Sequence, residues 1–212
     1  MSELNFVFAF GFLASVAFAF YLGEHPELRT GDRDTSVHQF MSAPTDPNNE
    51  ASVTASLMQH FVTNDAAINI LKSHEGLALD AYPEADHWLI GYGHKGDEVH
   101  GGMSISAQTA ERYLRKDLRT SEDFIRSVVL VPLNENEFSA LVILSYNIGT
   151  GAFRNSTVLR LLNEGERKAA ADAFLMWNKI KRNGELTVSA QLASRREAER
   201  ALFLSPPNSL KS

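Results

Sequence analysis

Glu75 is the side chain whose place in the sequence best suits proton transfer. Asn64 is a good N-cap for a helix, Asp65 suits its first turn, and Gly76 is expected to end it. Glu75 then falls in the last turn, where the negative end of the helix dipole disfavours a second negative charge. A partly desolvated carboxyl there keeps its proton more readily and suits general acid catalysis. The competing interpretation is an ordinary surface glutamate at a helix end.

The residues after Glu75 favour the catalytic interpretation. A tight loop leads into short strands rich in glycine and aromatic residues. The two stretches are EGLALDAYPE at 75–84 and WLIGYGH at 88–94. They resemble the phage-type lysozymes, a glycoside hydrolase family that includes many phage endolysins. In that family a helix ending in Glu-Gly precedes A-Y-x-D and then W-T-I-G-Y-G-H.

Later segments continue the resemblance to residue 203. Residues 131–142 (VPLNENEFSALV) resemble the family's V-P-L-x-x-x-x-F-x-A-L-V helix. Residues 146–157 (YNIGTGAFRNST) resemble its N-x-G-x-G-x-F-x-x-S-T segment. Residues 174–178 (FLMWN) and 195–203 (RREAERALF) resemble its closing motifs. A single motif of this kind is weak support, but an ordered series is specific.

The resemblance implies an α+β, mainly α fold with two lobes and a substrate cleft between them. The small lobe contains a short β-sheet, and the larger lobe is helical. Apolar spacing in the sequence independently predicts helices at 106–126 and around 138–144. Two further helices are predicted at 156–164 and 166–178, separated by Gly165.

The resemblance also implies how the chemistry is divided. A glycosidase needs a proton donor for the leaving oxygen and a second group that activates water or attacks the sugar. Glu75 is implied as the donor, and Glu84 stands where the family has an aspartate. Its side chain is one methylene longer, so its reach differs, and Asp86 is an alternative second carboxylate. The spacing along the chain leaves an inverting or a retaining outcome open.

Leu89 is the main departure from the family pattern. The family has a threonine just before I-G-Y-G-H that helps to hold the catalytic water, and leucine cannot hydrogen-bond a water. The stretch from Glu84 to Leu89 is also one residue shorter than the common spacing. Three outcomes stay open: Asp86 or His87 replaces the hydroxyl, catalysis is slower, or activity is lost. The intact donor motif favours retained activity.

Supporting roles are expected for five other side chains. Tyr146 and Asn147 either line the cleft, where Asn147 could bind an N-acetyl group, or pack within their helix. His94 is interpreted as a structural residue that supports the small lobe. One of Arg195 and Arg196 is expected to neutralise and orient Glu75 across the cleft. The chain has no cysteine and no cluster with metal-ligand spacing, so neither a metal nor a cofactor is predicted.

Residues 6–22 form an uncharged apolar run at the N-terminus. At about 1.5 Å per residue the run is at the short end of what spans a bilayer core of about 30 Å. A cleaved signal peptide, an uncleaved anchor, a weak anchor that later leaves the membrane, and a buried helix all remain open. Each membrane interpretation predicts attachment to the inner membrane or export, with the remaining chain in the periplasm of a Gram-negative host.

Composition and charge divide the rest of the chain. After the apolar segment 1–22, residues 23–61 form a polar linker with a short helix around 52–62, residues 62–205 form the lysozyme-like domain, and 206–212 form a tail. Seven acidic and two basic residues lie within 23–65, whereas acidic and basic residues balance within 66–212. This domain lacks the basic excess of nucleic-acid-binding proteins. We expect a monomer whose partner is peptidoglycan.

The sequence therefore predicts a lysozyme of the N-acetylmuramidase class. It would hydrolyse the β-1,4 bond between N-acetylmuramic acid and N-acetylglucosamine, as a phage endolysin for host lysis. Two alternatives remain. One is a membrane-tethered peptidoglycan-binding or scaffolding protein on a catalytically degraded lysozyme fold, and the other is a bacterial wall-remodelling muramidase.

Overall fold

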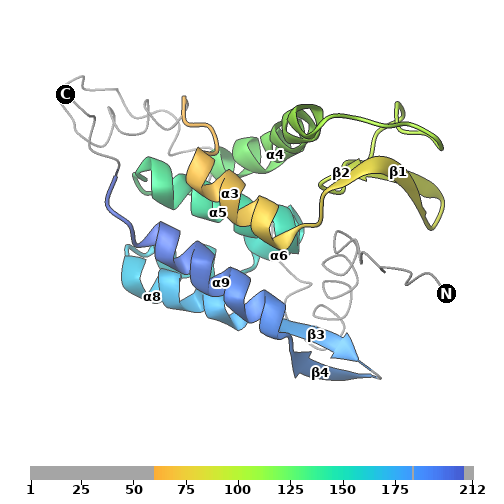
Figure 1. Cartoon of the computed structure of the whole chain (residues 1–212). Coiled ribbons are helices and arrows are strands. Elements are labelled where there is room, and N and C mark those ends of the chain that lie inside the picture. The colour runs from red at the N-terminus through yellow and green to blue at the C-terminus, as the bar shows by residue number, and fades with distance from the viewer. Residues whose placement is uncertain (1–59, 183, 208–212) are drawn as a thin grey trace.

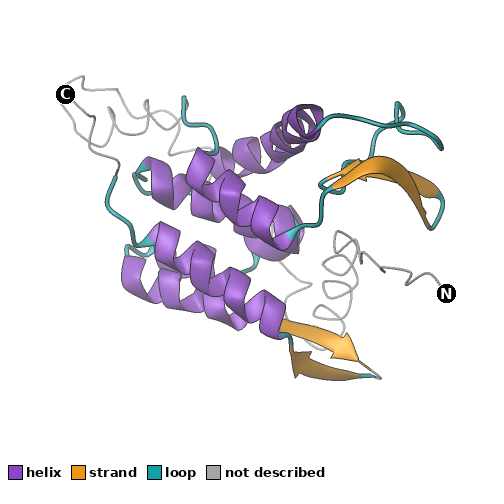
Figure 2. Ribbon diagram, in the orientation of Figure 1, coloured by secondary structure: helices purple, strands orange, loops and turns teal. Residues whose placement is uncertain are grey.

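The computed structural model describes residues 60–182 and 184–207. The predictions for the apolar segment, for most of the linker and for the end of the tail lie outside these residues, and residues 60–62 are not helical. The described part is α+β and mainly helical, as predicted. Its helices pack into one body, from which two separate two-stranded hairpins extend on the same side (Figures 1 and 2). Within 60–182 and 184–207, no helix has the length and apolarity needed to cross a bilayer.

The predicted helices are present with small differences in their bounds, except that the one predicted over 166–178 ends early. Capping side chains account for several of their starts: Ser106 accepts from the Thr109 N–H, and Asn134 forms a capping box with Glu137. The helices are α3 (Asp65–His74), α4 (Ala107–Val128), α5 (Glu135–Ile148), α6 (Thr150–Arg154), α7 (Thr157–Asn163), α8 (Arg167–Ala173) and α9 (Ala190–Phe203), with a 3-10 turn η5 (Phe174–Met176).

Helix α5 forms the centre of the hydrophobic core. Nearly all of its residues are buried, and Phe138, Leu141 and Leu144 are fully enclosed. A helix that is apolar all round is stable in water only when other elements cover it on every side. Helices α3, α4, α6 and α9 provide that cover. The ends of α3 and α9 are thereby fixed relative to α5.

The first hairpin consists of β1 (Ala78–Glu84) and β2 (His87–Gly91), paired antiparallel. Residues 103–105 add to the free edge of β1, since the Ala81 N–H bonds the Met103 carbonyl at 2.8 Å. Gly91 has a φ of +68°, and a Cβ there would lie 3.1 Å from the Cβ of Ala110. A glycine is therefore needed where the hairpin packs against α4.

The prediction of one helix over 166–178 is wrong at its C-terminal half. Helix α8 ends at Ala173, η5 follows, and a second hairpin forms from β3 (Lys179–Arg182) and β4 (Glu185–Val188). The sequence carried a signal for it, because Asn183-Gly184 is a dipeptide typical of tight hairpin turns. This hairpin leads directly into the start of α9.

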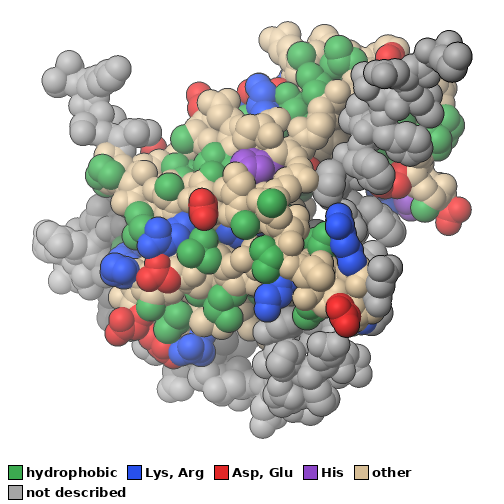
Figure 3. All heavy atoms as spheres, turned by 60° about the horizontal axis from the view of Figure 1, so that its bottom comes forward, with side chains coloured by type: hydrophobic (Ala, Val, Ile, Leu, Met, Phe, Trp, Pro, Cys, Tyr) green, Lys and Arg blue, Asp and Glu red, His purple; other side chains and the backbone are tan. Residues whose placement is uncertain are grey.

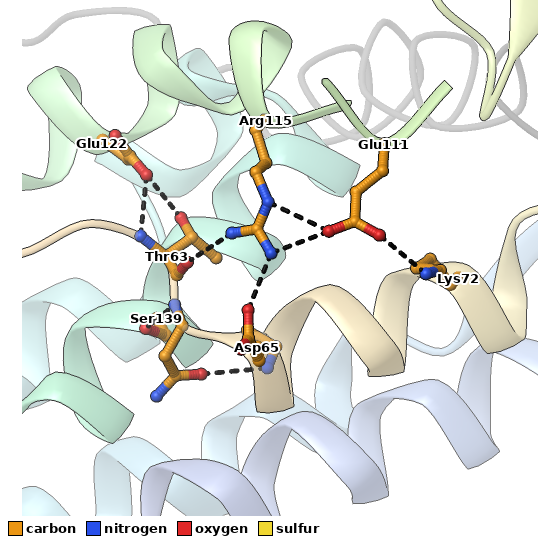
Figure 4. A network of polar contacts seen from close by, with 9 residues as sticks. Thr63, Asp65, Lys72, Glu111, Arg115, Glu122 and Ser139 are labelled. Atoms are coloured by element: carbon orange, nitrogen blue, oxygen red, sulfur yellow. Dashed lines mark hydrogen bonds and ion pairs between the residues drawn. The ribbon is translucent and has the colours of Figure 1, made fainter. Parts of the chain in front are cut away.

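A set of polar contacts, here called the entry clamp (Thr63, Asp65, Arg115 and Glu122), holds the chain where it enters the domain (Figure 4). The Thr63 N–H and hydroxyl both donate to Glu122 Oε1, at 2.8 and 2.7 Å. Arg115 donates to Asp65 at 2.7 Å. Arg115 and Glu122 both lie on α4, so the segment before α3 is fastened to a different helix.

The face that bears α8 and α9 carries charges of both signs. Figure 3 shows lysine and arginine side chains interspersed there with acidic and hydrophobic ones. Several are paired, as in the Arg200–Asp172 contact of 2.6 Å between α9 and α8. The mixture agrees with the balanced charge of residues 66–212.

Candidate active site

Glu75 lies one residue beyond the last helical residue of α3, rather than within the last turn. Its backbone N–H still bonds the Leu71 carbonyl at 2.8 Å, but its ψ of 138° is extended. The chain can therefore turn at once toward β1. The side chain points into the protein and is only 8% exposed.

Arg195 is the arginine that contacts Glu75. Its Nη1 donates to Glu75 Oε1 at 2.6 Å, and the arginine side chain is 4% exposed. No hydrogen bond from the described residues reaches the other carboxylate oxygen of Glu75, Oε2. One oxygen of Glu75 is therefore held in place, and the other is available to a ligand.

Tyr82 connects Glu75 with the first hairpin. Burial, followed by the Glu84 and Glu75 carboxylates, raises the pKa of the Tyr82 phenol to about 12. Tyr82 and Glu84 are two residues apart on β1 and so project from the same face. Tyr82 therefore lies within electrostatic reach of both carboxylates, although no hydrogen bond among the described residues joins Glu84 to Glu75. The sequence analysis did not identify Tyr82 as a site residue, although its position two residues before Glu84 in a strand predicts that both side chains project from the same face.

Asp86, His87 and Leu89 occupy different positions on the first hairpin and differ in exposure. Glu84 pairs with His87 across the two-residue turn Ala85-Asp86, and both Asp86 and His87 are exposed. Leu89 pairs with Tyr82 on the same face as Glu84 but is only 6% exposed. An alkyl group therefore sits on the face that carries the second carboxylate, while Asp86 is at the tip of the turn.

Tyr146 and Asn147 lie near the end of α5, which packs against α9. Burial, then the Asp117 and Glu75 carboxylates, raise the pKa of the Tyr146 phenol, and Arg195 opposes the rise. The amide oxygen of Asn147 accepts a hydrogen bond from Arg196 Nη2. Tyr146 thus lies within electrostatic reach of the candidate acid, and Asn147 is bonded to the arginine next to Arg195 in the sequence.

His94 is buried and held on both sides. Its Nδ1 lies 2.9 Å from the Asp117 carboxylate, its Nε2 lies 3.3 Å from Glu98, and its ring stacks on Tyr113. Burial raises the pKa of Asp117, and the hydrogen bond with His94 opposes that rise. These contacts tie the loop after β2 to α4. The sequence analysis did not identify Asp117, because a single acidic residue on the polar face of a helix does not by itself indicate a buried contact.

The stability of the His94 contacts is expected to depend on acid pH through Glu98. The Glu98 carboxylate accepts hydrogen bonds from its own backbone N–H, from Lys116 and from His94, which lowers its pKa from 4.5 to about 2. A lowered folded-state pKa stabilises the fold above the unfolded value, and this contribution is lost as pH falls through the folded value. Urea midpoints of the wild type and Glu98→Gln should therefore differ at neutral pH and converge between about pH 4.5 and about pH 2. A constant difference across that range would contradict the prediction.

Glu75 contacts Arg195 directly, and its charge acts on the phenols of Tyr82 and Tyr146, the first of which Glu84 affects as well. Among the described residues no group of three or more metal-ligating side chains occurs. The arrangement can present a carboxyl, held by a cation on one side, to a group that needs a proton.

Comparison with known proteins identifies relatives over the same region. The Phage lysozyme family model matches residues 72–199. The endolysin of Salmonella phage P22 is 46% identical over 143 residues, which are 65% of this chain and 94% of that protein. The SAR-endolysin of Enterobacteria phage P21 is 34% identical over 131 residues, 61% of this chain and 77% of that protein.

Two further matches are a longer phage endolysin and a muramidase domain of known structure. The endolysin of Bacillus phage B103 is 42% identical over 144 residues, 66% of this chain, but this chain spans only 53% of that protein. Among solved structures, the muramidase domain of SpmX from Asticaccaulis excentricus has a TM-score of 0.65 at 39% identity. The match covers 69% of this chain and 99% of that domain.

Proposed function

Because the chain belongs to the phage lysozyme family, we propose that it is a peptidoglycan-degrading muramidase with Glu75 as the proton donor. One observation carries the proposal: Glu75 is nearly enclosed, with Oε1 held by Arg195 and Oε2 without a hydrogen bond from the described residues. A general acid needs such a carboxyl, fixed in direction and free on one oxygen. The bond cleaved would be the β-1,4 link from N-acetylmuramic acid to N-acetylglucosamine.

The reaction needs one proton and one nucleophile. Glu75 would transfer its proton to the glycosidic oxygen as the bond from that oxygen to the anomeric carbon breaks. Glu84 would either take a proton from the attacking water or attack the anomeric carbon itself. Arg195 would stabilise the carboxylate left on Glu75. Asn147 and Tyr146 would contact the sugar beside the acid.

Leu89 is expected to limit the rate in this scheme. Replacing Leu89 with Thr places a hydroxyl on the face that carries Glu84 and supplies a hydrogen bond for a water. We expect kcat to rise by about tenfold, which corresponds to about 1.4 kcal/mol of barrier. The measurement is the initial rate of reducing-end release, with Leu89→Val as the matched control that adds no hydroxyl. Equal rates for the Thr and Val variants would show that no water is held there.

The N-terminal apolar run gives the proposed location. Residues 6–22 would attach the protein to the inner membrane or direct its export, with the domain in the periplasm and the protein acting in host lysis. Supporting this are the run itself and the likeness to phage endolysins, of which that of phage P21 is named a SAR-endolysin. Separation of membrane and periplasmic fractions, followed by detection of the domain, would test it.

The decisive experiment is digestion of purified peptidoglycan by the full-length protein. Release of new reducing ends that carry N-acetylmuramic acid, identified by mass spectrometry, is the expected result. Reducing ends that carry N-acetylglucosamine would mean a different bond. Sedimentation with peptidoglycan without any release would favour the tethered binding protein instead.

A further inference from the structure

Glu199 is a fully buried carboxylate that the catalytic scheme does not use. It lies on α9 and its side chain has no exposed surface. Its Oε1 accepts from Arg195 Nε at 3.0 Å, and its Oε2 lies 2.8 Å from Arg196 Nη1. The second contact is an ion pair without hydrogen-bond geometry. Each oxygen thus faces a different arginine, four and three residues earlier on the same helix.

Each of these arginines makes one further contact, and both contacts lead to the candidate site. Arg195 bonds Glu75, which follows α3, and Arg196 bonds the amide oxygen of Asn147 on α5. We propose that Glu199 is a positioning residue that sets the orientation of Glu75 through Arg195 and that of Asn147 through Arg196. This inference rests on the proposed function of Glu75 as the acid.

Charge balance explains why a carboxylate is needed at this point. Arg195, Arg196 and Glu75 alone would leave one surplus positive charge in a nearly dry environment, and Glu199 cancels it. Burial lowers the pKa of Arg196 to about 10, and the Glu199 carboxylate opposes this fall. Burial also acts to lower the pKa of Arg195, but Glu199 and Glu75 together raise it.

Because Arg195 is shared between two carboxylates, it attracts the Glu75 carboxylate less strongly than an arginine devoted to Glu75 alone would. A cation devoted to Glu75 alone would favour the ionised form, which cannot donate a proton. The titratable and charged groups around Glu75 are Arg195 and Arg196 from α9, Tyr146 from α5 and Tyr82 from β1. Glu199 contacts Arg195, and its removal leaves Arg195 to pair with Glu75 alone.

The test compares full-length Glu199→Gln and Glu199→Asp with Glu197→Gln, which removes an exposed carboxylate two residues away on the same helix. Reducing-end release is measured from about pH 4 to about pH 9 at a temperature at which circular dichroism shows every variant folded. For Glu199→Gln we expect kcat to fall by about tenfold and the alkaline limb of the pH profile to move to lower pH. Glu199→Asp should restore the limb toward the wild-type position, and Glu197→Gln should match the wild type.

A second readout does not depend on activity. The carbon NMR chemical shift of the Glu75 side-chain carboxyl, compared at one fixed pH, should differ between the wild type and Glu199→Gln, because Arg195 then contacts Glu75 alone. An unchanged chemical shift, or activity that falls only with the folded fraction and keeps its pH profile, would overturn the positioning role. An inactive wild type with a changed chemical shift in the variant would instead refute the proposed function and leave the positioning role standing.

Discussion

Replacing Glu75 with Gln is expected to lower the rate of glycan-strand cleavage by at least about 100-fold, the usual size of a general acid's contribution. The amide has nearly the same shape, and its oxygen can still accept a hydrogen bond from Arg195 Nη1. It has no carboxyl proton to give to the leaving oxygen. The measurement is turbidity clearing of outer-membrane-permeabilised Gram-negative cells, supported by reducing-end release from purified peptidoglycan.

Glu135→Gln is the matched control, since Glu135 is an exposed glutamate in the first turn of α5. It should clear cells at the wild-type rate. Clearing by Glu75→Gln at a similar rate would remove Glu75 from the mechanism. Loss of clearing with retained binding to peptidoglycan would assign its role to the chemical step.

Arg195→Met is expected to lower the free energy of unfolding by about 3–5 kcal/mol, the usual cost of removing one partner from a buried ion pair. The Met side chain fills much of the same space, but Glu75 loses its cation and Glu199 keeps only Arg196. Urea unfolding followed by circular dichroism measures the change.

An exposed arginine provides the control for this prediction. Arg112 donates to the Thr109 hydroxyl on the same helix and pairs with no acidic side chain in the described part of the chain. Arg112→Met should cost less than about 0.5 kcal/mol. If the two variants lost equal stability, the buried network would contribute nothing beyond an ordinary surface contact.

The helices of the domain could be predicted from the sequence because their signals are local. Asn64, Ser106 and Asn134 all cap helices as their types suggest. The second hairpin was missed because no element was predicted for residues 179–189, although their Asn183-Gly184 dipeptide is typical of a hairpin turn.

The candidate site could be predicted only in part, for a physical reason. Glu75 and Glu84 stand in motifs that lie close together in the sequence, so a resemblance could identify them. Which arginine faces Glu75 depends on the rotation of α9 against α3, and no local pattern records that angle. Glu199 lies in the motif at 195–203, but its proposed role depends on Arg195 and Arg196 facing it from one turn earlier, which the motif alone does not reveal.

The entry clamp has a mechanical consequence if residues 6–22 hold the protein at a membrane, as proposed. Tension applied through residue 60 reaches Phe61 and Thr63 before α3, and their contacts pass it to Arg126 and Glu122 on α4. Helix α3 begins at Asp65, after these contacts, so it is relieved of much of the load, and it ends beside Glu75. A tether could pull on this domain while the carboxyl at the far end of α3, about 15 Å away at 1.5 Å per residue, keeps its alignment.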